Sequence, residues 1–460
     1  MVAVGGRSRS RAREVADLPE PDSPTRPTVS PGEMLKEMPW TASRPENAMR
    51  RSRAASSGAG ETGVAEVIEA RIADVRPLRA GGRCWSGLFL ERTAELRHPI
   101  AMSVSGLRLS VLDQSPVPAG ATPAQALSNS LDLARHVDAL GYTRLWYSEH
   151  HAMDLLACTA PEILVARAAS ATERIRVGSG GVMLPHYSPY KVAEVFRTLY
   201  AMFPGRIDLG IGRAPGGGQL EMHALRRTRQ GPIVDDFPQQ LAELQAFLHR
   251  ERFPAEHPFA RLRVAPDAQG APDVWLLGSS MWSSITAAKE GLPYAFAHFF
   301  SAQGTRQAIE YYQRNFVPGP DRSEPEATIA IGAICAPTQE EAEFLHASVR
   351  LLQQRIRMDD RRPVASPEDA LRELESLPPV PSTPWPLTIG SQDQPESEFP
   401  RYVVGTPERV AEELTEIARE LEIGELIVNT ITHSHEARKR SYTLLAAAMK
   451  LSGAIGSAAA

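Results

Sequence analysis

An arginine that follows an apolar segment and precedes a run of glycines is the feature of this sequence that most directly suggests chemistry. Residues 207–212 read as a short buried strand, Arg213 comes next, and residues 216–218 are all glycine. A guanidinium at the end of a strand lies at the rim of a sheet, where backbone without side chains lets a ligand approach. Such a site can hold an anion, most often a phosphate. The alternative is a connection whose glycines only turn the chain.

A second group consists of Glu149, His150 and His151, which follow the apolar segment 144–148. A histidine has a pKa of about 6.5, so His150 can accept or donate a proton near neutral pH. The alternative is a buried structural histidine that is hydrogen-bonded to Glu149. Side chains of adjacent residues tend to diverge, and no carboxylate–histidine spacing completes a ligand set, so no metal site is expected.

A third group is formed by Ser279, Ser280 and Ser283, which come after the apolar segment 274–278, where a helix is expected to begin. The free N–H groups and the dipole of a helix N-terminus favour a bound anion. The simpler interpretation is that these serines only cap the helix. Both roles are compatible with the same residues.

Eight short apolar segments alternate with helical patterns, and the groups described above come at their ends. The segments are continuously apolar, which is typical of strands buried on both faces of a parallel sheet. Eight such units predict an α/β fold, a (β/α)8 TIM barrel with insertions, in which chemistry gathers at the carboxyl ends of the strands. The competing fold is an open doubly wound sheet, but its G-x-G-x-x-G fingerprint is absent after the first strand. The predicted strands are residues 107–112, 144–148, 176–184, 207–213, 274–278, 294–298, 328–334 and 425–429.

The composition bounds the class of protein. A net charge of −5 over 460 residues suggests neither a nucleic-acid nor a membrane partner, and no apolar run reaches the roughly 18 residues of a membrane span. Three widely spaced cysteines fit a cytoplasmic protein without disulfides. Residues 1–101 are rich in Arg, Pro, Ser, Ala and Gly, so we expect a mostly disordered extension before a barrel domain at 102–460, with Met102 as a possible internal start. The proline-rich residues 357–402 are expected to be mostly loop.

Five segments of the barrel region, taken together, resemble the luciferase-like flavin-dependent monooxygenases, the family that includes the bacterial luciferase (alkanal monooxygenase) chains. The resemblance covers roughly residues 105–450. The segments, in chain order, are residues 148–151, 178–185, 210–213, 278–283 and 404–408.

The resemblance implies a site for reduced FMN at the mouth of the barrel. Arg213 is similar to the arginine that contacts the phosphate, with Ser280, Ser283 and the adjoining Ser279 at the helix start. His150, with Glu149, matches the histidine used near the isoalloxazine as a base or proton donor. Gly180 and Gly181 match a non-proline cis peptide beneath the flavin, for which the alternative is a β-bulge. Gly212 stands where many luciferases have a reactive cysteine. Gln239 stands near the position of a second phosphate arginine, so we expect either a lower phosphate affinity or a replacement such as Arg226, Arg227 or Arg229.

The chemistry implied is that FMNH₂ reacts with O₂ to give a C4a-peroxyflavin, which oxygenates a small, partly hydrophobic organic substrate. A separate NAD(P)H-dependent flavin reductase is expected to supply FMNH₂, and a homodimer is expected from the family. The substrate is expected near Trp146, Trp282, Phe296 and Phe299, beneath lids formed by the segment after Arg213 and by residues 357–402. The alternatives are F420-dependent hydride transfer on the same fold and a non-catalytic flavin-binding homologue.

Overall fold

The computed structural model describes residues 106–225, 235–249, 253–377 and 397–452. The predicted extension at 1–101, the possible start at Met102 and the three candidate arginines at 226, 227 and 229 lie outside these residues. None of the helices among the described residues is both long and apolar enough to cross a membrane.

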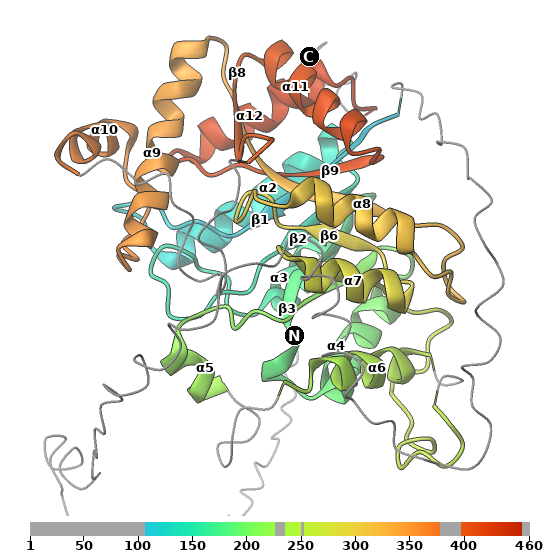
Figure 1. Cartoon of the computed structure of the whole chain (residues 1–460). Helices are drawn as coiled ribbons and strands as arrows, with labels where there is room; N and C mark the ends of the chain where they lie inside the picture. The colour runs from blue at the N-terminus through green and yellow to red at the C-terminus, as the bar shows by residue number, and fades with distance from the viewer. Residues whose placement is uncertain (1–105, 226–234, 250–252, 378–396, 453–460) are drawn as a thin grey trace, which may run out of the picture. The chain divides into compact units, whose positions relative to one another are not determined.

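Eight parallel strands form a closed barrel, as predicted (Figure 1). Strands β1 to β6 pair in chain order, β6 also pairs with β7, and β9 lies between β7 and β1. The ninth strand, β8, extends the wall by pairing with the second half of β7. The strands are β1 (Arg108–Asp113), β2 (Arg144–Tyr147), β3 (Arg176–Met183), β4 (Ile207–Gly212), β5 (Asp273–Gly278), β6 (Tyr294–Phe296), β7 (Ala327–Cys335), β8 (Tyr402–Gly405) and β9 (Glu425–Asn429).

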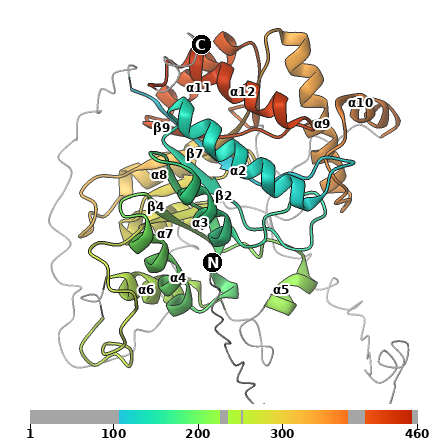
Figure 2. The same ribbon diagram turned by 180° about the vertical axis from the view of Figure 1, so that it is seen from behind.

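Helices surround the barrel, and Figure 2 shows α2, α3 and α4 on the side opposite to α8. The first of them begins as predicted, because Thr122 accepts a hydrogen bond from the Gln125 N–H and Pro123 follows, and it ends at Gly141 with a φ of 87°. The helices are α2 (Pro123–Leu140), α3 (Pro161–Ala171), the 3-10 helix η2 (Leu184–His186), α4 (Pro189–Met202), α5 (Gln219–Leu225), α6 (Phe237–Leu248), α7 (Met281–Glu290), α8 (Thr305–Asn315), α9 (Gln339–Arg357), α10 (Pro367–Ser376), α11 (Pro407–Glu420) and α12 (His435–Ala448).

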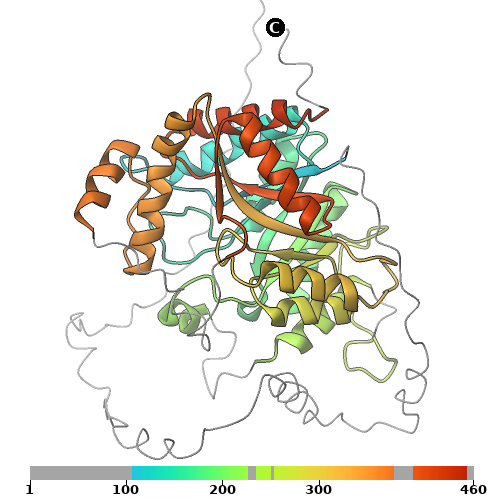
Figure 3. The same cartoon turned by 45° about the horizontal axis from the view of Figure 1, so that its top comes forward.

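Four elements were not predicted: η2, α5, α10 and β8. The 3-10 helix η2 follows β3, and α5 lies in the excursion after β4. The helix α10 lies within residues 357–402, which were expected to be mostly loop, and β8 begins at the last residue of that segment. The prediction for residues 357–402 is therefore wrong at α10, where the Ser366 hydroxyl accepts from the Asp369 N–H and Pro367 opens the helix. Helix α10 packs beside α9, which the three ribbon views show clearly (Figure 3).

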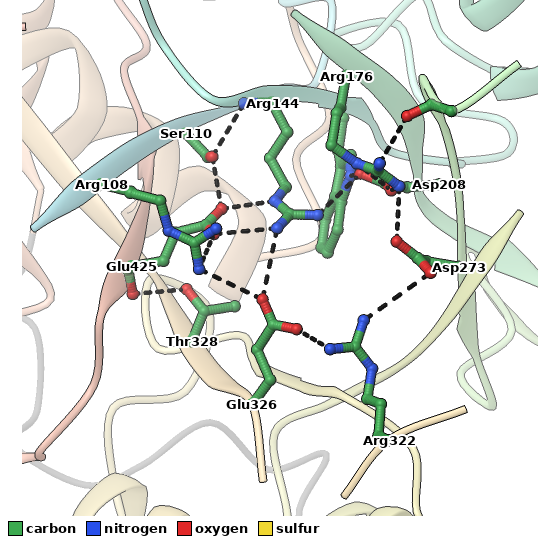
Figure 4. A network of polar contacts seen from close by, with 12 residues as sticks. Arg108, Ser110, Arg144, Arg176, Asp208, Asp273, Arg322, Glu326, Thr328 and Glu425 are labelled. Atoms are coloured by element: carbon green, nitrogen blue, oxygen red, sulfur yellow. Dashed lines mark hydrogen bonds and ion pairs between the residues drawn. The ribbon is translucent and has the colours of Figure 1, made fainter. Parts of the chain in front are cut away.

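Side chains that point into the barrel form layers. At the amino ends of the strands the layer is ionic, and Figure 4 shows its network of arginines and carboxylates. The Arg144 guanidinium lies at its centre, 2.6 Å from Glu425 and 3.1 Å from Asp208. The next layer is apolar, and there the Trp146 and Trp275 rings meet edge-on at 5.2 Å. This filling leaves the carboxyl ends of the strands as the place for a ligand.

Candidate functional site

Arg213 lies directly after β4, at the carboxyl end of the strand. Its guanidinium lies over the ring of Trp282 in the first turn of α7, 4.0 Å from the ring centroid. Its Nη1 is 3.2 Å from a carboxylate oxygen of Asp235, and the Arg213 side chain is 41 % exposed. The structure thus brings the predicted phosphate arginine to the N-terminus of the helix that was predicted to share the phosphate.

The start of α7 offers free donors to a ligand. Ser280 is its N-cap residue, and the first backbone bond of the helix runs from the Ser284 N–H to the Ser280 carbonyl. The N–H groups of the first turn therefore have no partner within the helix. Ser280 is exposed and Ser279 is half-buried, and neither hydroxyl is bonded within the described part of the chain. These donors belong to the same helix turn as Trp282, over which Arg213 lies.

Ser283 lies differently from the other two serines. Its hydroxyl is buried, donates to the Ser280 carbonyl at 2.7 Å and lies 3.1 Å from the Tyr294 hydroxyl. A Cβ on Gly278 would lie 2.3 Å from this hydroxyl, so the serine packs tightly on the end of β5. Ser283 therefore stabilises the turn at the start of α7.

Two adjacent glycines, Gly180 and Gly181, lie in the second half of β3. The peptide bond between Gly180 and Gly181 is cis, as the resemblance implies, and the register of β3 with β4 shifts at the same place. A Cβ on Gly180 would lie 2.9 Å from the Cβ of Trp146, and one on Gly181 would lie 2.7 Å from the Gly210 carbonyl oxygen. Packing beneath and beside the bond thus excludes side chains. Gly181 is buried, whereas Gly180 is half-buried and leaves backbone that a flat ring can approach.

Glu149 is fully buried and accepts three hydrogen bonds. One oxygen accepts from His151 Nε2 and from the Tyr187 hydroxyl, each at 2.8 Å, and the other accepts from the Met183 N–H at 3.0 Å. Burial and the Glu149 carboxylate raise the pKa of Tyr187 above its ordinary value, so its hydroxyl remains a donor. Because Met183 is the last residue of β3 and lies two residues beyond Gly181, this carboxylate ties the segment after β2 to the end of β3.

His150 is half-buried beside this network but is not bonded to Glu149, so the predicted alternative of a His150–Glu149 pair is wrong. Its Nδ1 lies 3.1 Å from the Ser148 hydroxyl. Burial, followed by the neighbouring His151, lowers the pKa of His150 to about 4. The imidazole is therefore neutral near pH 7, where it is a weak base and can accept or donate a hydrogen bond.

The aromatic residues predicted around the substrate are not all at the mouth. Trp146 is buried in the barrel interior, where its Nε1 donates to Asp208 at 2.9 Å. Phe296 is also buried, and it packs with Tyr294 in the outer core between the barrel and its helices. Trp282 and Phe299 are partly exposed. The side-chain period of a strand explains the error, since position along the strand does not by itself give the face.

One side chain that the sequence did not single out, Tyr402, packs against the barrel strand β7. The Tyr402 ring of β8 covers Gly332, where a Cβ would lie 2.3 Å from it, and its hydroxyl donates to the Asn429 side chain at 3.2 Å. At the predicted second phosphate position, Gln239 donates to Glu243 instead of pointing to Arg213. The one sequence signal for Tyr402 was Gly332, because a glycine inside a strand can mark a place where a large side chain packs on the backbone.

One group with metal-ligand chemistry occurs among the described residues: Asp132, His435 and Glu436. The Lys439 ammonium lies 2.9 Å from a carboxylate oxygen of Asp132 and 2.9 Å from one of Glu436. The lysine therefore already provides the positive charge between these carboxylates, and the group is a surface ion-pair network.

Comparison with known proteins adds four findings. A family model described as luciferase-like monooxygenase matches residues 107–423. The N-acetyl-S-alkylcysteine monooxygenase of Bacillus subtilis (strain 168) is 37% identical over 345 residues, which cover 75% of this chain and 98% of that protein. The crystal structure of apo-MsnO8 is 44% identical with a TM-score of 0.67, over 76% of this chain and 99% of that one. The oxygenating constituent of 3,6-diketocamphane monooxygenase from Pseudomonas putida, in complex with FMN, shares the fold at 19% identity and a TM-score of 0.54, over 74% and 96%.

Proposed function

Because the chain belongs to the luciferase-like monooxygenase family, we propose that it is a monooxygenase that uses reduced FMN and O₂ to oxygenate a small, partly hydrophobic organic substrate. The observation that carries this proposal is the meeting of Arg213 with the free donors of α7 at the mouth of the barrel, beside the bare Gly180–Gly181 backbone. An anion site and a surface for a flat ring are the two parts that a flavin mononucleotide requires.

The phosphate end fits the residues present. Arg213 uses Nη1 for Asp235, and within the described chain its remaining N–H groups have no carboxylate partner. Ser279, Ser280 and the N–H groups of the first turn of α7 would share the phosphate with it, because a helix N-terminus favours an anion. Ser283 would contribute indirectly, by holding the turn through the Ser280 carbonyl.

The protein's share of the chemistry is positioning and proton handling. When bound, reduced FMN supplies the two electrons that activate O₂, so that one oxygen atom enters the substrate and the other leaves as water. His150, which is neutral near pH 7, would handle a proton at its imidazole, and its low pKa means that it would hold this proton only transiently. Glu149 would act as a positioning residue, since all its bonds go to neighbouring protein groups.

The substrate and partners are proposed more broadly. The relative named for N-acetyl-S-alkylcysteines favours a thioether among the organic compounds to test first. No residue pattern in the chain suggests its own NAD(P)H site, so we infer a separate flavin reductase. We also propose that the protein forms a homodimer and acts in the cytoplasm.

Rapid mixing tests this function. The full chain with anaerobic FMNH₂ is mixed with oxygenated buffer, and the flavin spectrum is followed with time. We expect a transient species whose spectrum differs from those of reduced and oxidised FMN, and whose lifetime is shorter when substrate is present. His150→Ala should bind flavin but lose substrate oxygenation. Direct oxidation at the rate of free FMNH₂ would refute the oxygenase function, and hydride transfer from reduced F420 would then be measured.

A further inference from the structure

Arg213 belongs to a closed circuit of four residues. Its guanidinium lies on the Trp282 ring, and its Nη1 is bonded to one oxygen of Asp235 at 3.2 Å. The other oxygen of Asp235 accepts from the Phe237 N–H at 3.4 Å, and the Phe237 ring meets Trp282 edge-on at 5.5 Å. The circuit joins the end of β4 to the starts of α6 and α7.

Asp235 introduces a negative charge at the point where an anion would bind. It is the one carboxylate bonded to Arg213 within the described ranges, and its side chain is 61 % exposed. The pair has no net charge, so only the donors at the start of α7 attract an approaching phosphate. A phosphate dianion on Arg213 would compete with Asp235 for the guanidinium and would be repelled by its charge.

We propose that Asp235 is a competing internal anion, which weakens phosphate binding at Arg213 and so determines how readily a phosphorylated flavin leaves the site. This inference rests on the proposed function, in which flavin arrives reduced from a separate protein and must be exchanged. Weak retention of the phosphate suits that exchange, because a cofactor held too tightly would stay oxidised in the site.

The alternative role for Asp235 is to orient Arg213 for the ligand. That role predicts the opposite sign, because a positioning partner that is removed weakens binding. Asn at this position keeps the shape and an oxygen acceptor for the Phe237 N–H, and it removes only the charge. The direction of the change in affinity on Asp235→Asn therefore distinguishes the two roles.

The experiment titrates the full-length protein with oxidised FMN and with riboflavin and follows flavin fluorescence. In Asp235→Asn, the Kd for FMN should fall by about three- to tenfold, the range expected when one exposed charge near a dianion is removed. The Kd for riboflavin, which has no phosphate, should stay within about twofold. Glu243→Gln is the matched control, because Glu243 lies on α6, the helix that follows Asp235. Its side chain bonds to Gln239, and its replacement changes the net charge equally.

The outcomes separate this inference from the proposed function. If the unaltered protein binds FMN and Asp235→Asn binds it equally or more weakly, the inference is wrong and the proposed function stands. Equal tightening of FMN and riboflavin, or equal tightening in Glu243→Gln, would also overturn it. If neither protein binds FMN, the inference and the proposed flavin site fail together.

Discussion

Replacing Glu149 tests whether this buried carboxylate positions the site or takes part in the chemistry. Glu149→Ala would leave the donors of Met183, His151 and Tyr187 without their acceptor. A hydrogen bond to a charged group is worth about 1.5 to 3 kcal/mol. The His151 side chain is 13 % exposed, so it can partly turn to water, and we expect a total loss of about 3 to 5 kcal/mol in the free energy of unfolding.

Glu149→Gln should cost much less. Its carbonyl oxygen can accept from the Met183 N–H, while its NH₂ group donates to the Tyr187 oxygen and to Nε2 of neutral His151. We expect a loss of about 1 to 2 kcal/mol, with flavin binding and oxygenation retained. Tyr187→Phe, which removes one donor, should cost about 1 kcal/mol.

Calorimetric melting of the full chain measures these differences. Over the roughly 350 barrel residues, an unfolding entropy of about 2.1 cal/mol/K per residue converts the loss in Glu149→Ala into a fall in Tm of about 4 to 7 °C. Exposed Glu173→Ala serves as the control and should leave Tm unchanged. A Tm for Glu149→Ala within about 1 °C of the unaltered protein would refute the network argument. Loss of oxygenation in Glu149→Gln at unchanged Tm would instead make Glu149 a chemical participant.

Three further predictions follow from the geometry. Arg213→Ala should weaken FMN binding by about 10- to 100-fold and leave riboflavin binding unchanged; an equal loss for both flavins in fluorescence titrations would contradict the phosphate role. Gly180→Ala should lower the free energy of unfolding by about 1 to 3 kcal/mol, and so Tm by a few degrees, and it should weaken flavin binding, because its Cβ would lie 2.9 Å from Trp146. Gly106→Ala, whose Cβ meets nothing within 4 Å, should be neutral. Burial lowers the pKa of His298 to about 4, so below pH 6.5 the unfolded chain binds more protons than the folded one, and stability is lost as pH falls from 6.5 toward 4. His298→Gln should therefore flatten the fall of Tm over this pH range. An unchanged slope would show that other groups cause the fall.

The barrel was predictable because its signals are local and repeated. Continuous apolar runs identify strands buried on both faces, and caps such as Thr122 and Gly141 mark helix ends. Strand β8 was missed because its four residues, Tyr402–Gly405, follow a proline-rich segment and pair only with the distant β7. Short elements that depend on non-local pairing leave little trace in the sequence.

The site was predictable at its anchors and less so in its contacts. Arg213, the α7 start and the Gly180–Gly181 backbone could be identified from strand ends and glycines. The partners of a side chain depend on rotamers and on the packing of remote elements, so sequence order paired Glu149 with His150, whereas the fold pairs it with His151. For the same reason Asp235, far from Arg213 in the chain, carried no signal.

The ionic layer of Figure 4 has a kinetic consequence. Arg144, Asp208 and Glu425 close one end of the barrel, and Trp146 and Trp275 fill the axis above them, so the described strands enclose no passage from that end to the other. Every molecule that reaches the backbone at Gly180 must then enter and leave through the mouth at the carboxyl ends of the strands. Under the proposed function, flavin that lies against this backbone binds first and leaves last, and substrate and product bind between the flavin and the mouth. High substrate concentrations should then obstruct flavin exchange and slow turnover.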